Sequence, residues 1–217
     1  HGCTLPRGWE RMYPNFVASE AALASENVYF TDYHAKREAF ELTMYPFTRN
    51  AVAAFDWGGV LMNRYMSKDN KSRHQRFTGD IFEMATAITN QTSVNCVALT
   101  PDALATLPAF EIEWLRQLPT VWSDLRFLGG YPGKYFAVAR QTTAGKWYAA
   151  AINADSRPLT LTLDLPMFAG KVVKVYADGP KNKGSLWLTP GMKQQKVGKN
   201  GRLTVTVQPN GGVIVNE

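Results

Sequence analysis

The chain has 217 residues and a net charge of +6, and 45% of its residues are apolar and 19% charged, which is typical of a globular protein with a substantial core. No apolar run reaches the ~18 residues that a membrane span needs. The basic excess comes with no basic helix and no RNA-type aromatic motif, so we expect no nucleic-acid partner. The two cysteines, Cys3 and Cys96, are too few for a disulfide framework or a metal cluster, and Cys96 is expected to be a buried thiol.

The first 26 residues combine turn formers and small residues with Glu10, Glu20 and Glu26. On a helix, a spacing of six residues places two side chains about 240° and ~9 Å apart, and on a strand it places them some 20 Å apart. The spacing by itself therefore favours two solvated carboxylates, which would share a site only if the chain turned between them. His1 is either a site residue at a strand end or simply where the chain starts. We expect the polypeptide to continue upstream, where any export signal would lie.

Strand-like and helical segments alternate over the first half of the chain. Residues 51–61 (AVAAFDWGGVL) predict a buried strand, 78–91 (TGDIFEMATAITNQ) a helix, 93–99 (SVNCVAL) a second buried strand, and Pro101 to about Gln117 another helix. This alternation is typical of parallel βα units. So few units cannot close a (β/α)8 barrel, which needs roughly 200 residues or more. The sequence therefore predicts the C-terminal portion of such a barrel over residues 1–122.

Short strand-like runs separated by turn residues follow Pro119. They are DLRFLGG, KYFAVARQ, KWYAAAIN, LTLTLDL, KVVKVYAD, SLWLTP, RLTVTVQ and GGVIVN. Regular short strands predict an antiparallel β-sandwich over residues 123–217, with Trp147, Val173, Val175 and Val205 facing its core. The lysine-rich segment 193–202 is predicted to be a solvated loop. The expected fold class is thus α/β plus β, and the incomplete barrel is expected to leave unpaired strand edges that invite aggregation or pairing with another copy.

A series of motifs in this chain resembles glycoside hydrolase family 97 over nearly all 217 residues. The N-terminal motifs match the family without gaps, and they are His1-Gly2, Pro6-Arg7-Gly8, Arg11, Tyr13-Pro14-Asn15, Glu20 and Glu26. Further matches are Pro46-Phe47-Thr48-Arg49, residues 133–153 and Pro209-Asn210-Gly211-Gly212. FDWGG at 55–59 stands where the family has a methionine-aspartate-tyrosine segment, and Ala18-Ser19-Glu20-Ala21 replaces a threonine-arginine-glutamate-glycine run.

The resemblance implies roles for individual residues. Glu26 matches the family's general acid, and Glu20 matches a carboxylate that binds an active-site calcium ion, with Glu26 as a further ligand of that ion. His1 matches a substrate-contacting histidine. Gly2 stands where inverting members carry a general-base glutamate, so the chain resembles the retaining branch. In that branch an aspartate nucleophile lies on an earlier barrel strand, upstream of His1.

The function implied by the resemblance is that of a retaining, exo-acting α-glycosidase, of which this chain is the C-terminal part. Its substrates would be α-glucosides or α-galactosides in oligosaccharides, and its location periplasmic or secreted. Glycoside cleavage needs one carboxylic acid to protonate the leaving oxygen and a second carboxylate to attack or to activate water. The partner of this chain would be the upstream half of the same polypeptide or another copy. The alternative is a non-catalytic carbohydrate-binding or structural fragment that lacks the nucleophile.

Overall fold

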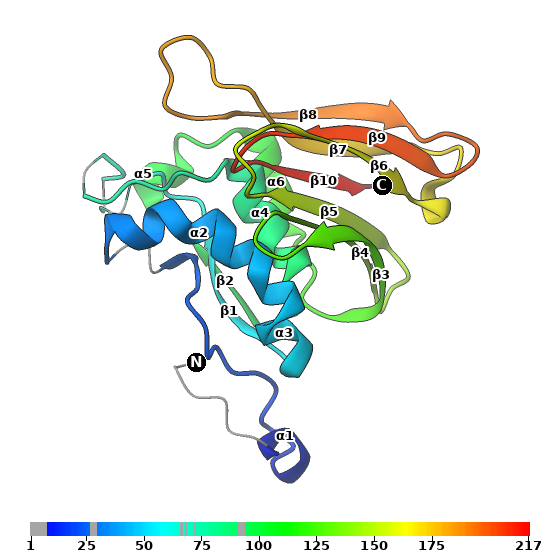
Figure 1. The fold of residues 1–217 in the computed structure, drawn as a ribbon, viewed down its shortest axis with the longest axis horizontal. Coiled ribbons are helices and arrows are strands. Elements are labelled where there is room, and N and C mark those ends of the chain that lie inside the picture. The colour runs from blue at the N-terminus through cyan, green and yellow to red at the C-terminus, as the bar shows by residue number, and fades with distance from the viewer. Residues whose placement is uncertain (1–7, 27–29, 66, 68, 72, 91–93) are drawn as a thin grey trace.

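The computed structural model describes residues 8–26, 30–65, 67, 69–71, 73–90 and 94–217 (Figure 1). Its helices are α1 (Trp9–Met12), α2 (Asp32–Met44), α3 (Arg49–Val52), α4 (Asp80–Thr89), α5 (Pro101–Leu104) and α6 (Ala109–Arg116), with short 3-10 helices at Tyr45–Phe47 and Pro166–Phe168. Its strands are β1 (Asp56–Leu61), β2 (Val94–Ala98), β3 (Trp122–Tyr131), β4 (Tyr135–Thr142), β5 (Trp147–Asn153), β6 (Leu159–Asp164), β7 (Val172–Gly179), β8 (Thr189–Lys196), β9 (Arg202–Val207) and β10 (Gly212–Asn216).

The first half of the chain contains a small parallel sheet surrounded by helices. Strands β1 and β2 run parallel, with Asp56 opposite Val94 and Leu61 opposite Ala98. Ser19 forms a parallel bridge to Phe55, so the N-terminal segment runs alongside β1. Both strands and helix α4 were predicted from the sequence and are confirmed.

Two predictions for this half of the chain are wrong. Strand β2 is not buried, because in the described part of the chain it pairs with β1 alone and its other edge is open. Cys96 is therefore exposed rather than a core thiol. The helix expected from Pro101 to Gln117 is two helices, α5 and α6, because Pro108 stands at the N-cap of α6 in an extended backbone conformation that no helix interior adopts.

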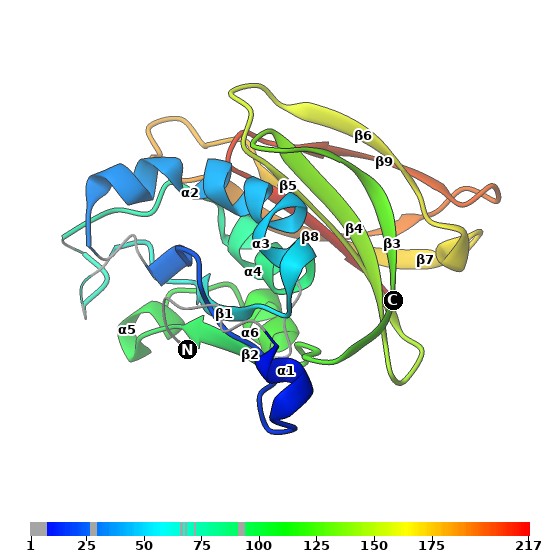
Figure 2. The ribbon, with the colours of Figure 1, turned by 60° about the horizontal axis from the view of Figure 1, so that its bottom comes forward.

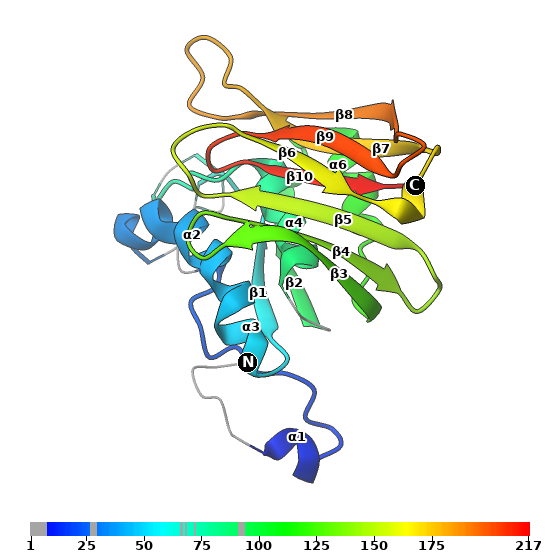
Figure 3. The same ribbon diagram turned by 45° about the vertical axis from the view of Figure 1, so that its right-hand side comes forward.

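The second half forms two antiparallel sheets packed face to face (Figure 3). The larger has the strand order β3-β4-β5-β10-β7-β8, and the smaller pairs β6 with β9. In β9 the residues alternate between exposed and buried, as the sequence pattern predicts. Val173, Val175 and Val205 are buried between the two sheets and Trp147 packs against the same cluster. The predicted antiparallel fold and the predicted core are confirmed.

Strand β8 differs from the sequence prediction. The expected strand SLWLTP is a loop up to Leu188, and the chain pairs with β7 only from Thr189 to Lys196. Residues 193–196, which were predicted to be part of a loop, therefore lie on the edge strand of the larger sheet. This strand shows no apolar alternation because most of its side chains face solvent, so the sequence carries no signal for it.

The larger sheet is covered on both faces. The β6–β9 pair lies on one face, and helix α4 lies on the other with the rest of the first half of the chain (Figure 2). One buried cluster contains Phe82 and Ile88 of α4 together with Phe136, Ile152 and Ile214 of the sheet. Residues on both sides of the predicted boundary near Trp122 thus contribute to one hydrophobic core. The division into two domains at 122/123 stays a prediction.

Close contact between α4 and the sheet depends on a glycine. A Cβ added at Gly212 would lie 2.6 Å from Cα of Phe82 and 2.7 Å from the carbonyl oxygen of Ile81. Only glycine allows the sheet and helix backbones to approach this closely. No helix in the described residues is both long and apolar enough to cross a membrane.

Candidate active site

Glu20 and Glu26 are brought together by a turn in the chain. Ala21 has a φ of 46°, so the backbone changes direction directly after Glu20, and Glu26 lies in a short helical turn with Ser25. The side chain of Glu20 is 6% exposed and is hydrogen-bonded to that of Glu26. The expectation of two separate, solvated carboxylates, which rested on spacing alone, is therefore wrong.

The electrostatics of this pair favour one bound proton. Burial raises the pKa of Glu20 to about 7, and the charge of Glu26, the hydrogen bond to Glu26 and the charge of Asp56 raise it in the same direction. Carboxylates forced together in a poorly solvated place cannot all ionise at neutral pH. Near pH 7 a pair of carboxyl groups in such surroundings binds either a proton or, instead of the proton, a cation.

Arg49 holds the backbone next to Glu20 in position. Its Nε donates to the carbonyl of Glu20 at 2.9 Å, and its Nη2 donates to the carbonyl and to Oγ of Ser19, the latter at 3.1 Å. The guanidinium also lies over the ring of Phe55, 5.1 Å from its centroid. These contacts give Arg49, the last residue of the motif Pro46-Phe47-Thr48-Arg49, a structural role.

A second set of hydrogen bonds holds the backbone next to Glu26, through its neighbour Ser25. The Ser25 hydroxyl donates to the Glu83 carboxylate at 3.1 Å, and the same carboxylate oxygen accepts from the backbone N–H of Leu61 at 3.0 Å. Burial raises the pKa of Glu83. A Cβ added at Gly59 would lie 2.6 Å from Cβ of Ser25, so the segment that carries Glu26 packs directly on the backbone of β1. Ser25, Gly59 and Glu83 were not identified from the sequence, because their roles arise from contacts between distant segments.

The predicted metal ligands supply two carboxyl groups at one place. Within the described residues, no group of three or more His, Cys, Asp or Glu side chains is arranged to hold a metal ion. Carboxylate oxygens are the donors that calcium prefers, so Glu20 and Glu26 fit part of such a site. The remaining ligands would be backbone carbonyls, water or residues of the upstream polypeptide. His1 and Gly2 lie outside the described residues.

The comparisons with known proteins agree on one family. Residues 121–216 match the family model described as "Glycosyl-hydrolase 97 C-terminal, oligomerisation". A probable retaining alpha-galactosidase of Streptomyces bingchenggensis is 27% identical over 183 residues, which are 83% of this chain and 26% of that protein. The retaining alpha-galactosidase of Bacteroides thetaiotaomicron is 24% identical, over 98% of this chain and 32% of its own length. The chain thus spans about a third or less of these curated relatives.

Solved structures extend the similarity to the first half of the chain. The crystal structure of a beta-arabinopyranosidase superimposes with a TM-score of 0.91 and 44% identity, covering 100% of this chain and 33% of that one. A family 97 enzyme of Pseudoalteromonas sp. strain K8, solved with acarbose, shares the fold at a TM-score of 0.78 and 19% identity, covering 96% of this chain and 32% of that one. Residues 121–216 therefore match the C-terminal domain of glycoside hydrolase family 97, and the relatives and solved structures support a C-terminal part of a family 97 protein.

Proposed function

We propose that the full polypeptide is a retaining glycosidase that hydrolyses α-galactosides or β-arabinopyranosides. The two curated relatives are retaining alpha-galactosidases, and the neighbour at 44% identity is a beta-arabinopyranosidase. These substrates are related, because β-L-arabinopyranose has the ring configuration of α-D-galactopyranose and lacks only the C6 hydroxymethyl group. α-Glucosides, the other class predicted from the sequence, differ from α-galactosides at C4.

The observation that carries this proposal is the hydrogen-bonded carboxyl pair of Glu20, which is buried, and Glu26, which is half-buried. Glu26, hydrogen-bonded to Glu20, would act as general acid and protonate the glycosidic oxygen as the bond to the anomeric carbon breaks. The nucleophile would be a carboxylate of the upstream polypeptide, which forms the covalent glycosyl-enzyme. Glu26, now deprotonated, would then take a proton from the water that releases the sugar.

We also propose that Glu20 and Glu26 bind calcium in the complete protein. The charge of the ion would offset the repulsion between the carboxylates and would orient them toward the sugar. The small parallel sheet and its helices would be the C-terminal portion of a (β/α)8 barrel, whose active site would form at the carboxyl ends of its strands. The rest of the barrel, a periplasmic or secreted location and an oligosaccharide substrate belong to the same proposal.

The leaving group of the substrate tests the role of Glu26. In the full-length protein, Glu26→Gln should reduce cleavage of glycosides with poor leaving groups by at least ~10²-fold. Activated aryl glycosides should be affected much less, because their leaving groups need little protonation. Glu10→Gln is a matched control, since Glu10 is an exposed glutamate of the same N-terminal segment. Equal losses on both substrate types would contradict the assignment.

A further inference from the structure

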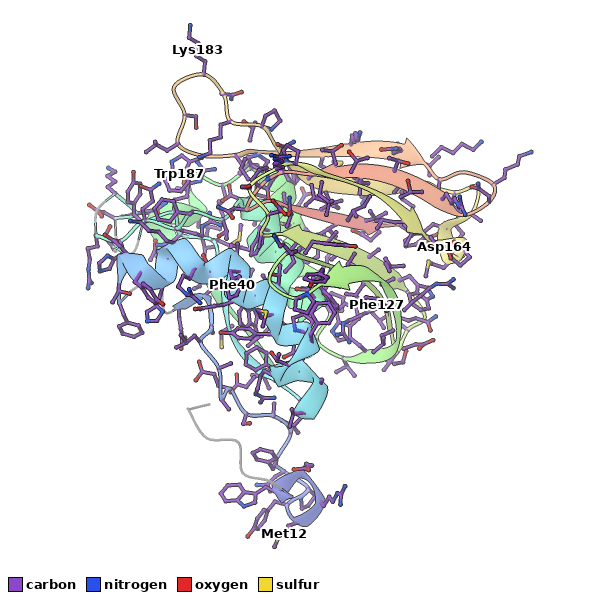
Figure 4. The ribbon with its side chains drawn as sticks, in the orientation of Figure 1. Met12, Phe40, Phe127, Asp164, Lys183 and Trp187 are labelled. Atoms are coloured by element: carbon purple, nitrogen blue, oxygen red, sulfur yellow. The ribbon has the colours of Figure 1, made fainter. Side chains whose placement is uncertain are left out.

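A cleft of about 200 Å³ lies beyond the carboxyl ends of β1 and β2. Arg64, Tyr65 and Asn70 from the segment after β1 line it, as does Thr106 from the connection after α5. The rest of the wall is formed by Met62, Leu107 and Trp187, and Trp187 belongs to the loop between β7 and β8 of the sandwich. Figure 4 shows Trp187 below the loop that carries Lys183, on the side of the molecule where α5 lies in Figure 1. The cleft is therefore formed jointly by the two halves of the chain.

The indole of Trp187 is fixed in this wall. The Ser185 hydroxyl oxygen accepts from the backbone N–H of Trp187 at 3.0 Å and donates to its carbonyl at 3.1 Å. The ring of Tyr65 meets the indole edge to face, with the centroids 5.6 Å apart, and the guanidinium of Arg64 lies 5.3 Å from the indole centroid. The aromatic pair is thus preorganised, which lowers the entropic cost of binding a ligand.

Several polar groups of these residues remain unused. Asn70 Oδ1 accepts from the backbone N–H groups of Arg64 and Tyr65 at 2.8 and 2.9 Å. Within the described part of the chain, the Asn70 amide nitrogen, the Tyr65 hydroxyl and the Trp187 indole N–H have no hydrogen-bond partner. These three residues are half-buried, so their donors are accessible to a ligand in the cleft.

The charges in the cleft disfavour an anionic ligand. Arg64 is the cationic side chain that lines the cleft. The Nη2 atom of Arg64 donates to the carboxylate of Asp80 at 2.6 Å. Asp80 is buried at the start of α4, so this ion pair neutralises Arg64 from inside. What remains is an uncharged lining of aromatic rings, hydrogen-bond donors and the apolar side chains of Met62 and Leu107, which suits an amphipathic, hydroxyl-rich molecule.

We propose that this cleft binds a pyranose unit of the substrate on the leaving-group side of the scissile bond. The two aromatic rings of Trp187 and Tyr65 stand at 82° to each other, so one of them would pack against the apolar face of that sugar. Their polar tips and Asn70 would bind its hydroxyl groups. The inference rests on the proposed glycosidase function and adds that the C-terminal domain contributes a substrate-binding residue. The cleft lies beyond the carboxyl ends of β1 and β2, and this is the end of the strands at which the active sites of (β/α)8 barrels form.

The test compares two substrates of the full-length protein that share the terminal sugar. One is an aryl glycoside with no second sugar, and the other is an oligosaccharide in which at least two further pyranose units follow the terminal sugar. Trp187→Ala should lower kcat/KM for the oligosaccharide at least 10-fold, mainly through KM, and should change kcat/KM for the aryl glycoside less than 2-fold. Tyr65→Phe, which keeps the ring and removes the hydroxyl, should give a smaller loss with the same selectivity. Leu186→Ala is the control, because Leu186 is an exposed neighbour on the same loop.

Each possible outcome of this comparison supports or overturns the proposed sugar-binding role of Trp187. Equal losses on both substrates, or no loss on either, would overturn it and would make Trp187 a packing residue only. A wild-type protein that cleaves neither substrate would refute the proposed function. In that case calorimetric titration with the same oligosaccharide still decides the inference, since weakened binding in Trp187→Ala alone supports it and binding equal to that of Leu186→Ala overturns it.

Discussion

Asp178 joins the larger sheet to helix α4, and its removal should loosen that junction. It lies near the end of β7 and is fully buried. Its Oδ1 accepts from the backbone N–H of Ile81 at 3.1 Å, and its Oδ2 accepts from the N–H groups of Phe82 and Gly212 at 2.8 and 2.9 Å. One side chain therefore caps α4 from a distance and ties it to β10.

The size of the effect follows from these three bonds. Asp178→Ala leaves three buried donors without an acceptor, and each costs about 1–3 kcal/mol, which gives roughly 3–6 kcal/mol of local stability after some rearrangement. Asp178→Asn keeps one of the two oxygens, so we expect about half that loss. Asp164→Ala is the control, because Asp164 pairs with Arg126 at an exposed site and surface pairs contribute about 0–1 kcal/mol.

Hydrogen–deuterium exchange of the full-length protein measures this effect directly. Burial raises the pKa of Asp178 to about 7 although the backbone N–H donors oppose the rise, so the measurement belongs above pH 7, where the carboxylate is ionised. Protection of peptides that contain Ile81, Phe82 and Gly212 should fall by ~10²-fold or more in Asp178→Ala, since each factor of ten is about 1.4 kcal/mol. Unchanged protection there, or an equal fall in Asp164→Ala, would refute the reasoning.

Gly59→Ala should destabilise the protein by about 1–3 kcal/mol, because the new Cβ would lie 2.6 Å from Ser25 Cβ. It should lower the thermal midpoint and, in the full-length protein, the kcat of the proposed glycosidase. Gly191→Ala, whose new Cβ meets no atom within 4 Å, should change neither. Burial and then the charge of Asp80 raise the pKa of Glu111 from 4.5 to about 8. Its stabilising contribution is therefore complete below pH 4.5 and is lost, at roughly 1 kcal/mol per pH unit, as the pH rises to 8. Glu111→Gln should flatten the fall of the thermal midpoint over this range, and a slope identical to that of the wild type would argue against a buried neutral Glu111.

Local patterns were sufficient for some of the regular elements. LTLTLD and RLTVTV alternate strictly, and they pair with each other as β6 and β9, with Leu161 opposite Val205. The apolar spacing of 78–91 identified α4, whose residues are all buried. In β6 and β9 one face must avoid water, and in α4 every face must avoid it. Both requirements are visible in the apolar residues of the element itself.

Contacts between distant segments decided the rest. The six-residue spacing of Glu20 and Glu26 indicated separate carboxylates, and they meet only because Ala21 turns the chain and Arg49 holds the turn. Strand β8 exists because β7 offers a free edge, and Trp187 reaches the cleft because that strand starts later than its sequence suggests. The physical reason is that local sequence sets the periodicity of an element, whereas the pairing of backbones and the burial of polar groups depend on which partner the tertiary structure places beside them.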